Sequence, residues 1–352
     1  MIRMSVLTLS VLFVLSGLSF SEAAFASGYG DHIPGDSTNK GKGNARKNNN
    51  VDVWGVNGHP LNQEPYFGNI DLQLSLIKEA GMSYYRIDIA HDEKGVVSGE
   101  YLARFKTLIQ KAAEQHITLI PVLFPPDSAT LYGLPDTAAA YEAGRVLGNG
   151  FAKQYGRLFT YYELGNENDA RVLKDPPGDG SDTAQYEHSR YVLLAGWFKG
   201  MIAGIKGMDE DAKFIISNSG WNRYAYFDVL KAEGVRFDIM GYHWYDGVEG
   251  LRSVLKKLRT DYADQTVWFT EINRRGGGST GTRIQKREVC KELSLIRRAG
   301  KNIRGAFIYE LFDQPHAAVS ESSYGLFGWE HYHDSAKPKG MTTALQKIVF
   351  KK

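Results

Sequence analysis

The sequence predicts a single (β/α)8 barrel of the α/β class, because three observations converge on that fold. From Val51 onward, short runs rich in β-branched and aromatic residues alternate with amphipathic helical stretches. The strand candidates are nearly continuous in apolar residues, as parallel strands covered on both faces are. Polar side chains gather at the C-terminal ends of these candidates, where the active sites of such barrels form.

The predicted strands are separated by segments long enough for helical crossovers. In chain order they cover residues 51–59, 83–90, 117–124, 158–166, 213–221, 237–245, 266–273 and 303–313. Helical repeats fill the connections, and Gly81 and Gly300 are expected to follow helix ends. One connecting helix shows apolar residues at helical spacing, namely Leu102, Phe105, Leu108, Ile109 and Ala112.

An open, doubly wound sheet is the alternative arrangement of such alternating units. That fold usually carries a glycine-rich turn after its first strand, and the segment "GVNGHPLNQ" does not match this fingerprint. We therefore expect one catalytic barrel over residues 51–352, with no internal repeat. Two loops are longer than a bare barrel requires: "DARVLKDPPGDGSD" after the fourth strand and the segment after the eighth.

The first 50 residues indicate export followed by a tether. Arg3 precedes an apolar run from Val6 to Leu18, and small residues ending in "AAFAS" complete the layout of a signal peptide over residues 1–26. The run is short for a membrane span, so we expect no stable membrane anchor, with an uncleaved anchor as the alternative. Residues 27–50 are predicted to be a flexible polar linker. The expected location is secreted or periplasmic.

Composition narrows the functional classes. The 42 basic and 40 acidic side chains leave a formal net charge of +2, which gives no support for nucleic-acid binding. Cys290 is the single cysteine, which excludes an intrachain disulfide and a metal site built on thiolates. We expect a monomer without a cofactor or metal, stabilised by its core.

Polar residues at the predicted strand ends outline a candidate active site. Two of them, Glu167 and Glu271, are carboxylates delivered by the fourth and seventh strands. Facing carboxylates about 5–5.5 Å apart suit a retaining glycoside hydrolase, in which one attacks the anomeric carbon and the other protonates the leaving oxygen. We expect Arg86 and Tyr245 to favour ionised Glu271, whose charge would in turn raise the pKa of Glu167.

The strand-end segments resemble clan A glycoside hydrolases. "YYELGNEN" resembles the Asn–Glu signature of their fourth strand, and "WFTEIN" their seventh-strand nucleophile segment. "FDIMGYHWY" resembles their sixth-strand Asp…His-x-Tyr pattern, and "YYRIDI" their second-strand arginine. The tail "YGLFGWEHYHDSAKPKGMTTAL" is similar to the loop and helix after their eighth strand. The resemblance spans Val51 to about Phe350 and is nearest to family 39 and its exopolysaccharide-cleaving relatives, with family 5 next.

The resemblance implies that Glu167 is the acid/base and Glu271 the nucleophile. It implies further that Asn166 binds the sugar 2-hydroxyl and that Tyr245 lies against Glu271. His243 would contact the acid side of the site or the sugar. Arg86 would hold Glu271.

Further substrate contacts are expected from aromatic residues and a third carboxylate. Trp221 and Trp329 would stack on sugar faces, whereas Glu310, like Asp313, would either contact substrate or support a loop. The chain departs from the resemblance at Asn168, where many relatives have proline. The tryptophan platform of the eighth strand is also missing, and the aromatic residues near that position are Phe307, Tyr309 and Phe312.

Each catalytic assignment has a structural alternative. Glu167 would then be an acid stabilised by a helix N-terminus, and Glu271 a partner of Arg274 or Arg275.

The supporting residues have structural alternatives too. Arg86 would neutralise Asp88, His243 would be a core histidine, and Glu163 is expected to be an interior acid with a structural partner. The segment "HYHD" at 331–334 is expected to be structural rather than a zinc site.

Three functional classes follow from these residues. A retaining glycoside hydrolase acting on a polysaccharide or oligosaccharide is favoured, with endo action on a matrix exopolysaccharide as one candidate. A transglycosylase uses the same glycosyl-enzyme. A non-catalytic glycan-binding barrel would not need both glutamates. A metal-dependent hydrolase needs more histidines at strand ends than His91 and His243.

Overall fold

Eight parallel strands close into a barrel in which each strand pairs with its neighbours in chain order and the eighth returns to the first. The computed structural model describes residues 50–349, except residues 176, 280 and 320. The predicted signal peptide and all of the predicted linker but Asn50 lie outside the described residues. The strands are β1 Val53–Gly58, β2 Tyr84–Asp88, β3 Thr118–Leu123, β4 Tyr161–Leu164, β5 Lys213–Asn218, β6 Ile239–Trp244, β7 Thr266–Ile272 and β8 Ile303–Ile308.

The predicted (β/α)8 barrel is therefore confirmed, and each predicted strand is present. The observed β4 and β8 are shorter than expected, because the chain turns away after Leu164 and after Ile308. The open-sheet alternative is excluded by the pairing of β1 with β8.

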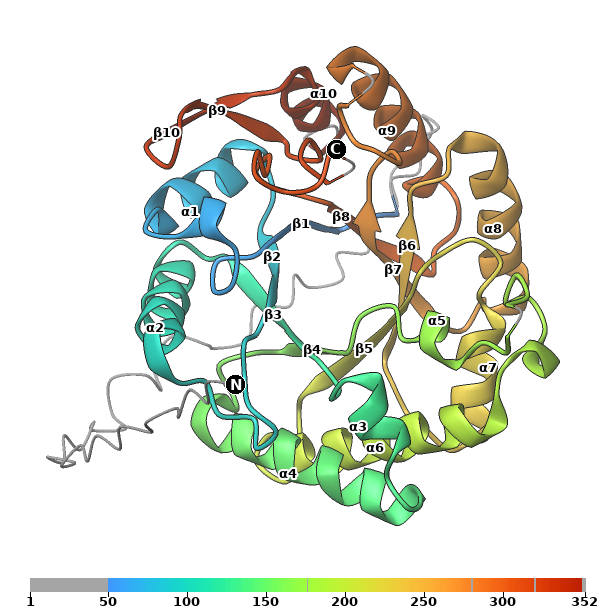
Figure 1. Ribbon diagram of the computed structural model, residues 1–352. Coiled ribbons are helices and arrows are strands. Elements are labelled where there is room, and N and C mark those ends of the chain that lie inside the picture. The colour runs from blue at the N-terminus through green and yellow to red at the C-terminus, as the bar shows by residue number, and fades with distance from the viewer. Residues whose placement is uncertain (1–49, 176, 280, 320, 350–352) are drawn as a thin grey trace, which may run out of the picture. The chain divides into compact units, whose positions relative to one another are not determined.

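Helices surround the strands, as Figure 1 shows. Their buried apolar side chains form the larger core together with residues of the strands, so apolar surface of both layers is removed from water. The main crossover helices are α1 Ile70–Glu79, α2 Gly99–Glu114, α4 Thr137–Tyr155, α6 His188–Lys206, α7 Ala225–Ala232, α8 Val248–Asp261, α9 Thr282–Ile296 and α10 Gly340–Val349. Shorter elements are η2 Glu64–Tyr66, α3 Ser128–Tyr132, α5 Asp169–Val172 and η3 Thr183–Gln185.

Helix α2 illustrates how the apolar spacing works. Phe105, Leu108 and Ala112 are buried, and Leu102 and Ile109 pack partly buried beside them. Gly81 follows α1 with φ of 80°, a left-handed position that glycine adopts without strain. The prediction for Gly300 is less accurate, because α9 already ends at Ile296.

The N-terminal half of the barrel interior is an apolar plug. Val53, Ile120, Ile215, Ile239, Trp268 and Phe307 form a cluster separate from the larger core outside the sheet. Two glycines make room for its largest rings. A Cβ on Gly55 would lie 2.3 Å from Phe307, and one on Gly305 would lie 2.4 Å from Trp268. A cavity in this barrel can therefore form at the other end of the strands.

A register shift in β7 determines where Glu271 points. On β6, Gly241 and His243 are two residues apart, yet their partners on β7, Trp268 and Glu271, are three apart. Side chains alternate along a regular strand, so Trp268 and Glu271 would face opposite sides. The extra residue on β7 restores the inward direction, which is a common use of a bulge beside an active site.

The two long loops both contain structure of their own. The loop after β4 contains α5 and η3, and the loop after β8 leads into an antiparallel hairpin of β9 (Phe327–His331) and β10 (Ser335–Pro338). Cys290 lies half-buried on α9. Within the described part of the chain, no helix has the length and apolar character needed to cross a membrane.

Candidate active site

Glu167 and Glu271 meet at the C-terminal end of the barrel. Glu271 lies near the end of β7, and Glu167 lies three residues after β4, with φ of 49°. One carboxylate oxygen of each, together with Nδ1 of His243, lies within 4.8 Å of the others. The structure thus brings together the two residues predicted to be catalytic.

Arg86 connects Glu271 to the rest of the barrel. It is 3% exposed, and all five of its N–H groups have an acceptor. Nε and Nη2 donate to the two oxygens of Glu163 at 2.6 and 2.7 Å, and Nη1 donates to Glu271 at 2.8 Å and to Asn57 at 2.7 Å. The last N–H donates to Asn166 at 2.6 Å. Burial alone would lower the pKa of Arg86, but Glu163 and Glu271 raise it overall.

The same network orients the groups predicted to touch the sugar. Tyr245 donates to the second oxygen of Glu271 at 2.6 Å, so both oxygens of this carboxylate are held. Because Oδ1 of Asn166 accepts from Arg86, its NH2 group is left to donate into the cavity that this residue lines. The predicted contacts of Arg86 and Tyr245 with Glu271 are present, and Asn166, predicted to bind the sugar, lines the same cavity.

His243 lies beneath both glutamates and is fully buried. Its Nδ1 lies 2.7 Å from Glu167 and 3.4 Å from Glu271. Burial raises the pKa of Glu167, but the hydrogen bond and charge of His243 lower it more, so the net pKa lies below its usual value. Burial lowers the pKa of His243, whereas Glu271 and Glu167 raise it overall. The expectation that the charge of Glu271 raises the pKa of Glu167 is therefore wrong, because the net pKa is lowered.

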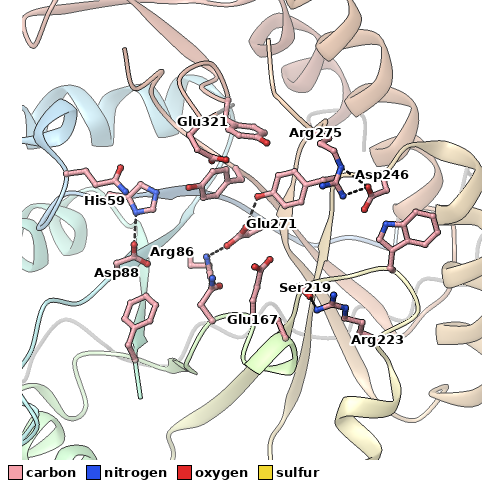
Figure 2. A pocket seen from close by; sticks show the side chains of 18 residues that line it. His59, Arg86, Asp88, Glu167, Ser219, Arg223, Asp246, Glu271, Arg275 and Glu321 are labelled. Carbon is pink, nitrogen blue, oxygen red and sulfur yellow. Dashed lines mark hydrogen bonds and ion pairs between the residues drawn. The ribbon is translucent and has the colours of Figure 1, made fainter. Parts of the chain in front are cut away.

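A cavity of about 670 Å³ opens above the two glutamates. Figure 2 shows His59 and Asp88 on one side of the pair and Arg223, Arg275 and Asp246 on the other. His59 Nδ1 lies 2.6 Å from Asp88, and its Nε2 has no hydrogen-bond partner. The size is typical of a ligand site, and the carboxylates lie between its two sides.

The side opposite His59 combines an aromatic ring with two guanidinium groups. Trp221 lines the cavity with 46% of its surface exposed. Arg223 donates to buried Asp169 at 3.1 Å and to Ser219 at 2.7 Å, and Arg275 donates to Asp246. The predicted placement of Trp221 at the site therefore agrees with the structure.

Two predicted substrate contacts lie elsewhere. Glu310 is fully buried below the cavity, accepting from Tyr66 at 2.6 Å and from Gln314 at 2.8 Å. Burial raises its pKa to about 7. Trp329 packs against Phe312 with ring centroids 4.4 Å apart and does not line the cavity. Both positions suit support of the loop after β8, the alternative that was open for Glu310.

Asp313 also supports the loop after β8. It pairs with Lys339 at 2.8 Å and accepts from the backbone of Gly325 at 2.9 Å.

Several structural alternatives are resolved by the contacts. Arg86 does not pair with Asp88, whose partner is His59. Arg274 pairs with Glu288 and Arg275 with Asp246, so neither holds Glu271. Glu163 is the interior acid that was predicted, with Arg86 as its partner.

The possible metal ligands are arranged differently from the sequence pattern. Within 331–334, His333 pairs with Glu64 at 2.6 Å. Among the described residues, the three groups spaced closely enough for a metal ion are Glu167, His243 and Glu271 themselves. His91 accepts from the backbone of Phe124 at 3.2 Å and does not line the cavity.

Part of the cavity was not predicted. His59 follows β1 directly and is a strand-end residue that could have been found by position alone. Six further lining residues come from loops and have no periodic signal, namely Gln63, Ser219, Arg223, Asp246, Glu321 and Tyr324. Of the three aromatic residues named near the missing tryptophan platform, Tyr309, which follows β8, lines the cavity.

Comparison with solved structures identifies the fold. A β-glucosidase from Thermotoga maritima in complex with cyclophellitol superposes with a TM-score of 0.62 at 13% sequence identity, covering 85% of this chain and 97% of that one. The β-glycosidase BGL167 gives 0.59 at 13% identity, over 86% and 96% of the two chains. The likeness is one of fold.

Another structure of the Thermotoga maritima protein, described as a family 1 β-glucosidase, gives 0.60 at 14% identity over 85% of this chain and 97% of its own. No family model and no curated protein matches the sequence. The Thermotoga maritima protein is described as a member of family 1, so the resemblance of this chain to families 39 and 5 remains a prediction.

Proposed function

We propose that this protein is an exported, retaining glycoside hydrolase that cleaves β-glycosidic bonds of a polysaccharide. The observation that carries the proposal is the closeness of Glu167 and Glu271, whose nearest oxygens lie within 4.8 Å. Carboxyl groups about 5–5.5 Å apart suit double displacement, whereas inverting enzymes keep them about 6.5–9.5 Å apart to admit water.

In the first step, an oxygen of Glu271 forms a bond to the anomeric carbon as the bond to the leaving oxygen breaks. Glu167 gives its proton to that leaving oxygen, and a glycosyl ester of Glu271 results. Arg86 and Tyr245 hold Glu271 in place, so little reorganisation accompanies the attack. The NH2 group of Asn166 is available to the sugar 2-hydroxyl as positive charge develops on the ring.

In the second step, water attacks the same carbon from the opposite face. Glu167 now takes a proton from that water, the ester bond to Glu271 breaks, and the sugar is released with its original configuration. A sugar hydroxyl in place of water would give transglycosylation through the same intermediate.

His243 supplies a place for the proton before substrate binds. Nδ1 of His243 lies 2.7 Å from Glu167, close enough for direct proton transfer; burial lowers the pKa of His243, but the charges of Glu271 and Glu167 raise it overall. A bound sugar excludes water and lowers the local dielectric, which favours neutral Glu167 over the ion pair. The proton then moves over a single hydrogen bond to the residue that must donate it.

Two features support a polymer substrate outside the cytoplasm. The cavity extends to both sides of the glutamates, so sugar units can bind on either side of the cleaved bond (Figure 2). The signal-peptide layout of residues 1–26 supports export. The β-glucosidase neighbours support a β-linkage.

The first test is release of reducing ends from a panel of β-linked polysaccharides by the wild type, Glu167→Gln and Glu271→Gln. Exposed Glu330, on β9, provides the control Glu330→Gln. We expect both active-site variants to lose at least about 1,000-fold in kcat/KM, equivalent to about 4 kcal/mol, and the control to keep its rate. Full activity in either variant overturns that residue's role. Binding of a glycan without cleavage supports a binding barrel instead.

Azide rescue distinguishes the two roles. With an activated aryl β-glycoside, Glu271→Ala plus azide should give the α-glycosyl azide, because azide replaces the nucleophile. Glu167→Ala plus azide should give the β-glycosyl azide, because azide attacks the ester formed on Glu271. The opposite pair of products would exchange the assignments.

A further inference from the structure

The charges that line the cavity are unbalanced. Five carboxylates face it, from Asp88, Glu167, Asp246, Glu271 and Glu321, against three guanidinium groups from Arg86, Arg223 and Arg275. The whole chain, by contrast, has a formal net charge of +2. A cleft whose lining has an excess of negative charge raises the local concentration of positively charged ligands.

The three arginines of the lining are already engaged by carboxylates. Arg86 is saturated by its acceptors, including both oxygens of Glu163. Arg223 is paired with Asp169 and Arg275 with Asp246. Each of these three cations of the described cavity thus already shares its charge with a carboxylate, although the Arg275 side chain is 74% exposed.

Glu321 is the lining carboxylate with no paired cation. It lies on the loop between β8 and β9, and Figure 2 shows it above Glu271. No hydrogen bond or ion pair of its carboxylate is present among the described residues, whereas the other four lining carboxylates each have one. Burial raises the pKa of Glu321, and the nearby charges of Glu271 and Glu167 raise it further.

His59, which lines the same cavity, already has counter-charges. It is 6% exposed, with Nδ1 2.6 Å from Asp88 and Nε2 3.5 Å from buried Glu310. Among the described lining residues, Glu321 is therefore the carboxylate that a cationic ligand can pair with without displacing an existing partner.

We propose that the cleft is built for a glycan that carries free amino groups, and that Glu321 is the specificity-determining residue that receives the ammonium group. This inference rests on the proposed function and names its substrate class. A neutral glycan leaves Glu321 unpaired, and a uronic-acid polymer adds like charge to the field of five carboxylates. An amino sugar next to the cleaved bond supplies the missing counter-charge.

The test is calorimetric binding to the full chain carrying Glu271→Gln, with Glu167→Gln as a second inactive background. The probes are three β-1,4-linked hexamers, of glucosamine, N-acetylglucosamine and glucose, at about pH 6 and low salt. We expect the glucosamine hexamer to bind about fivefold tighter than the other two, with the preference lost in high salt, as for a partly exposed ion pair. Adding Glu321→Gln should remove the preference, whereas adding Glu330→Gln should preserve it.

Each other outcome overturns the inference. Equal binding of the hexamers, tighter binding of a neutral one, no binding of the glucosamine hexamer, or a preference that survives Glu321→Gln would each do so. Cleavage by the wild type is measured independently of this binding preference, so the two proposals can fail separately. If the wild type cleaves a neutral glycan and shows no such preference, the proposed function stands without this inference. If glucosamine binding depends on Glu321 but no glycan is cleaved, the amino-glycan specificity stands and the proposed hydrolysis fails.

Discussion

Replacing Arg86 by methionine should destabilise the barrel strongly and in a pH-dependent way. The variant leaves Glu163 (fully buried) and Glu271 (7% exposed) without their shared cation. Removing one partner of a buried ion pair costs about 3–5 kcal/mol, out of a total of about 5–15 kcal/mol for a typical domain. A buried carboxylate without a cation is tolerated better when protonated, so the deficit should shrink toward acidic pH.

Urea unfolding at pH 5 and pH 8 measures this effect. The control is Arg275→Gln, because that arginine is 74% exposed and its pair with Asp246 should contribute at most about 1 kcal/mol. The double variant Arg86→Met/Glu163→Gln should recover part of the loss. A loss below about 1 kcal/mol for Arg86→Met, or a loss equal at the two pH values, would refute the assignment of Arg86 as the central cation of the site.

Three further predictions address other parts of the molecule. Burial raises the pKa of Glu292 from 4.5 to about 8, so its ionisation in the unfolded chain opposes folding above pH 4.5. In urea unfolding, Glu292→Gln should therefore stabilise the protein by about 1–3 kcal/mol at pH 7 and leave its stability unchanged at pH 4.5. Gly220→Ala should lower the free energy of unfolding by at least about 2 kcal/mol, because its Cβ would lie 2.2 Å from the carbonyl oxygen of His243. The control Gly234→Ala, with a similar φ and open space around its Cβ, should lower it by about 1 kcal/mol in the same assay. Trp221→Ala should raise KM about fivefold with kcat unchanged, and Trp329→Ala should leave both constants as they are; equal effects would show that cavity lining does not mark sugar contacts.

The strands could be predicted because each is a short apolar run between helical repeats, and that pattern follows from burial on both faces of the sheet. The order of strands then required no further information, since consecutive βα units close in chain order. The loop residues Glu321 and Arg223 could not be predicted, because their place at the cavity depends on loop paths that leave no periodic signal.

The partners of the site residues were harder to predict than their positions. Arg86 and Asp88 are neighbours on one face of β2, so their pairing was a natural alternative. The choice of Glu163 depends on the next strands around the barrel, which sequence spacing does not give. The inward direction of Glu271 likewise depends on the extra residue in β7, and alternation from Trp268 would have predicted the wrong face.

The apolar plug at the N-terminal end of the barrel separates what the protein must keep from what it can change. Val53, Ile215 and Trp268 close one end of the barrel, while Glu321, Trp221 and Arg275 line the cavity at the other. Substitutions in the plug should alter melting temperature without altering the choice of glycan. Loop exchange at the open end should alter the choice of glycan at little cost in stability. Thermostability and specificity can therefore be improved in separate rounds of engineering and then combined, since distant sites contribute additively.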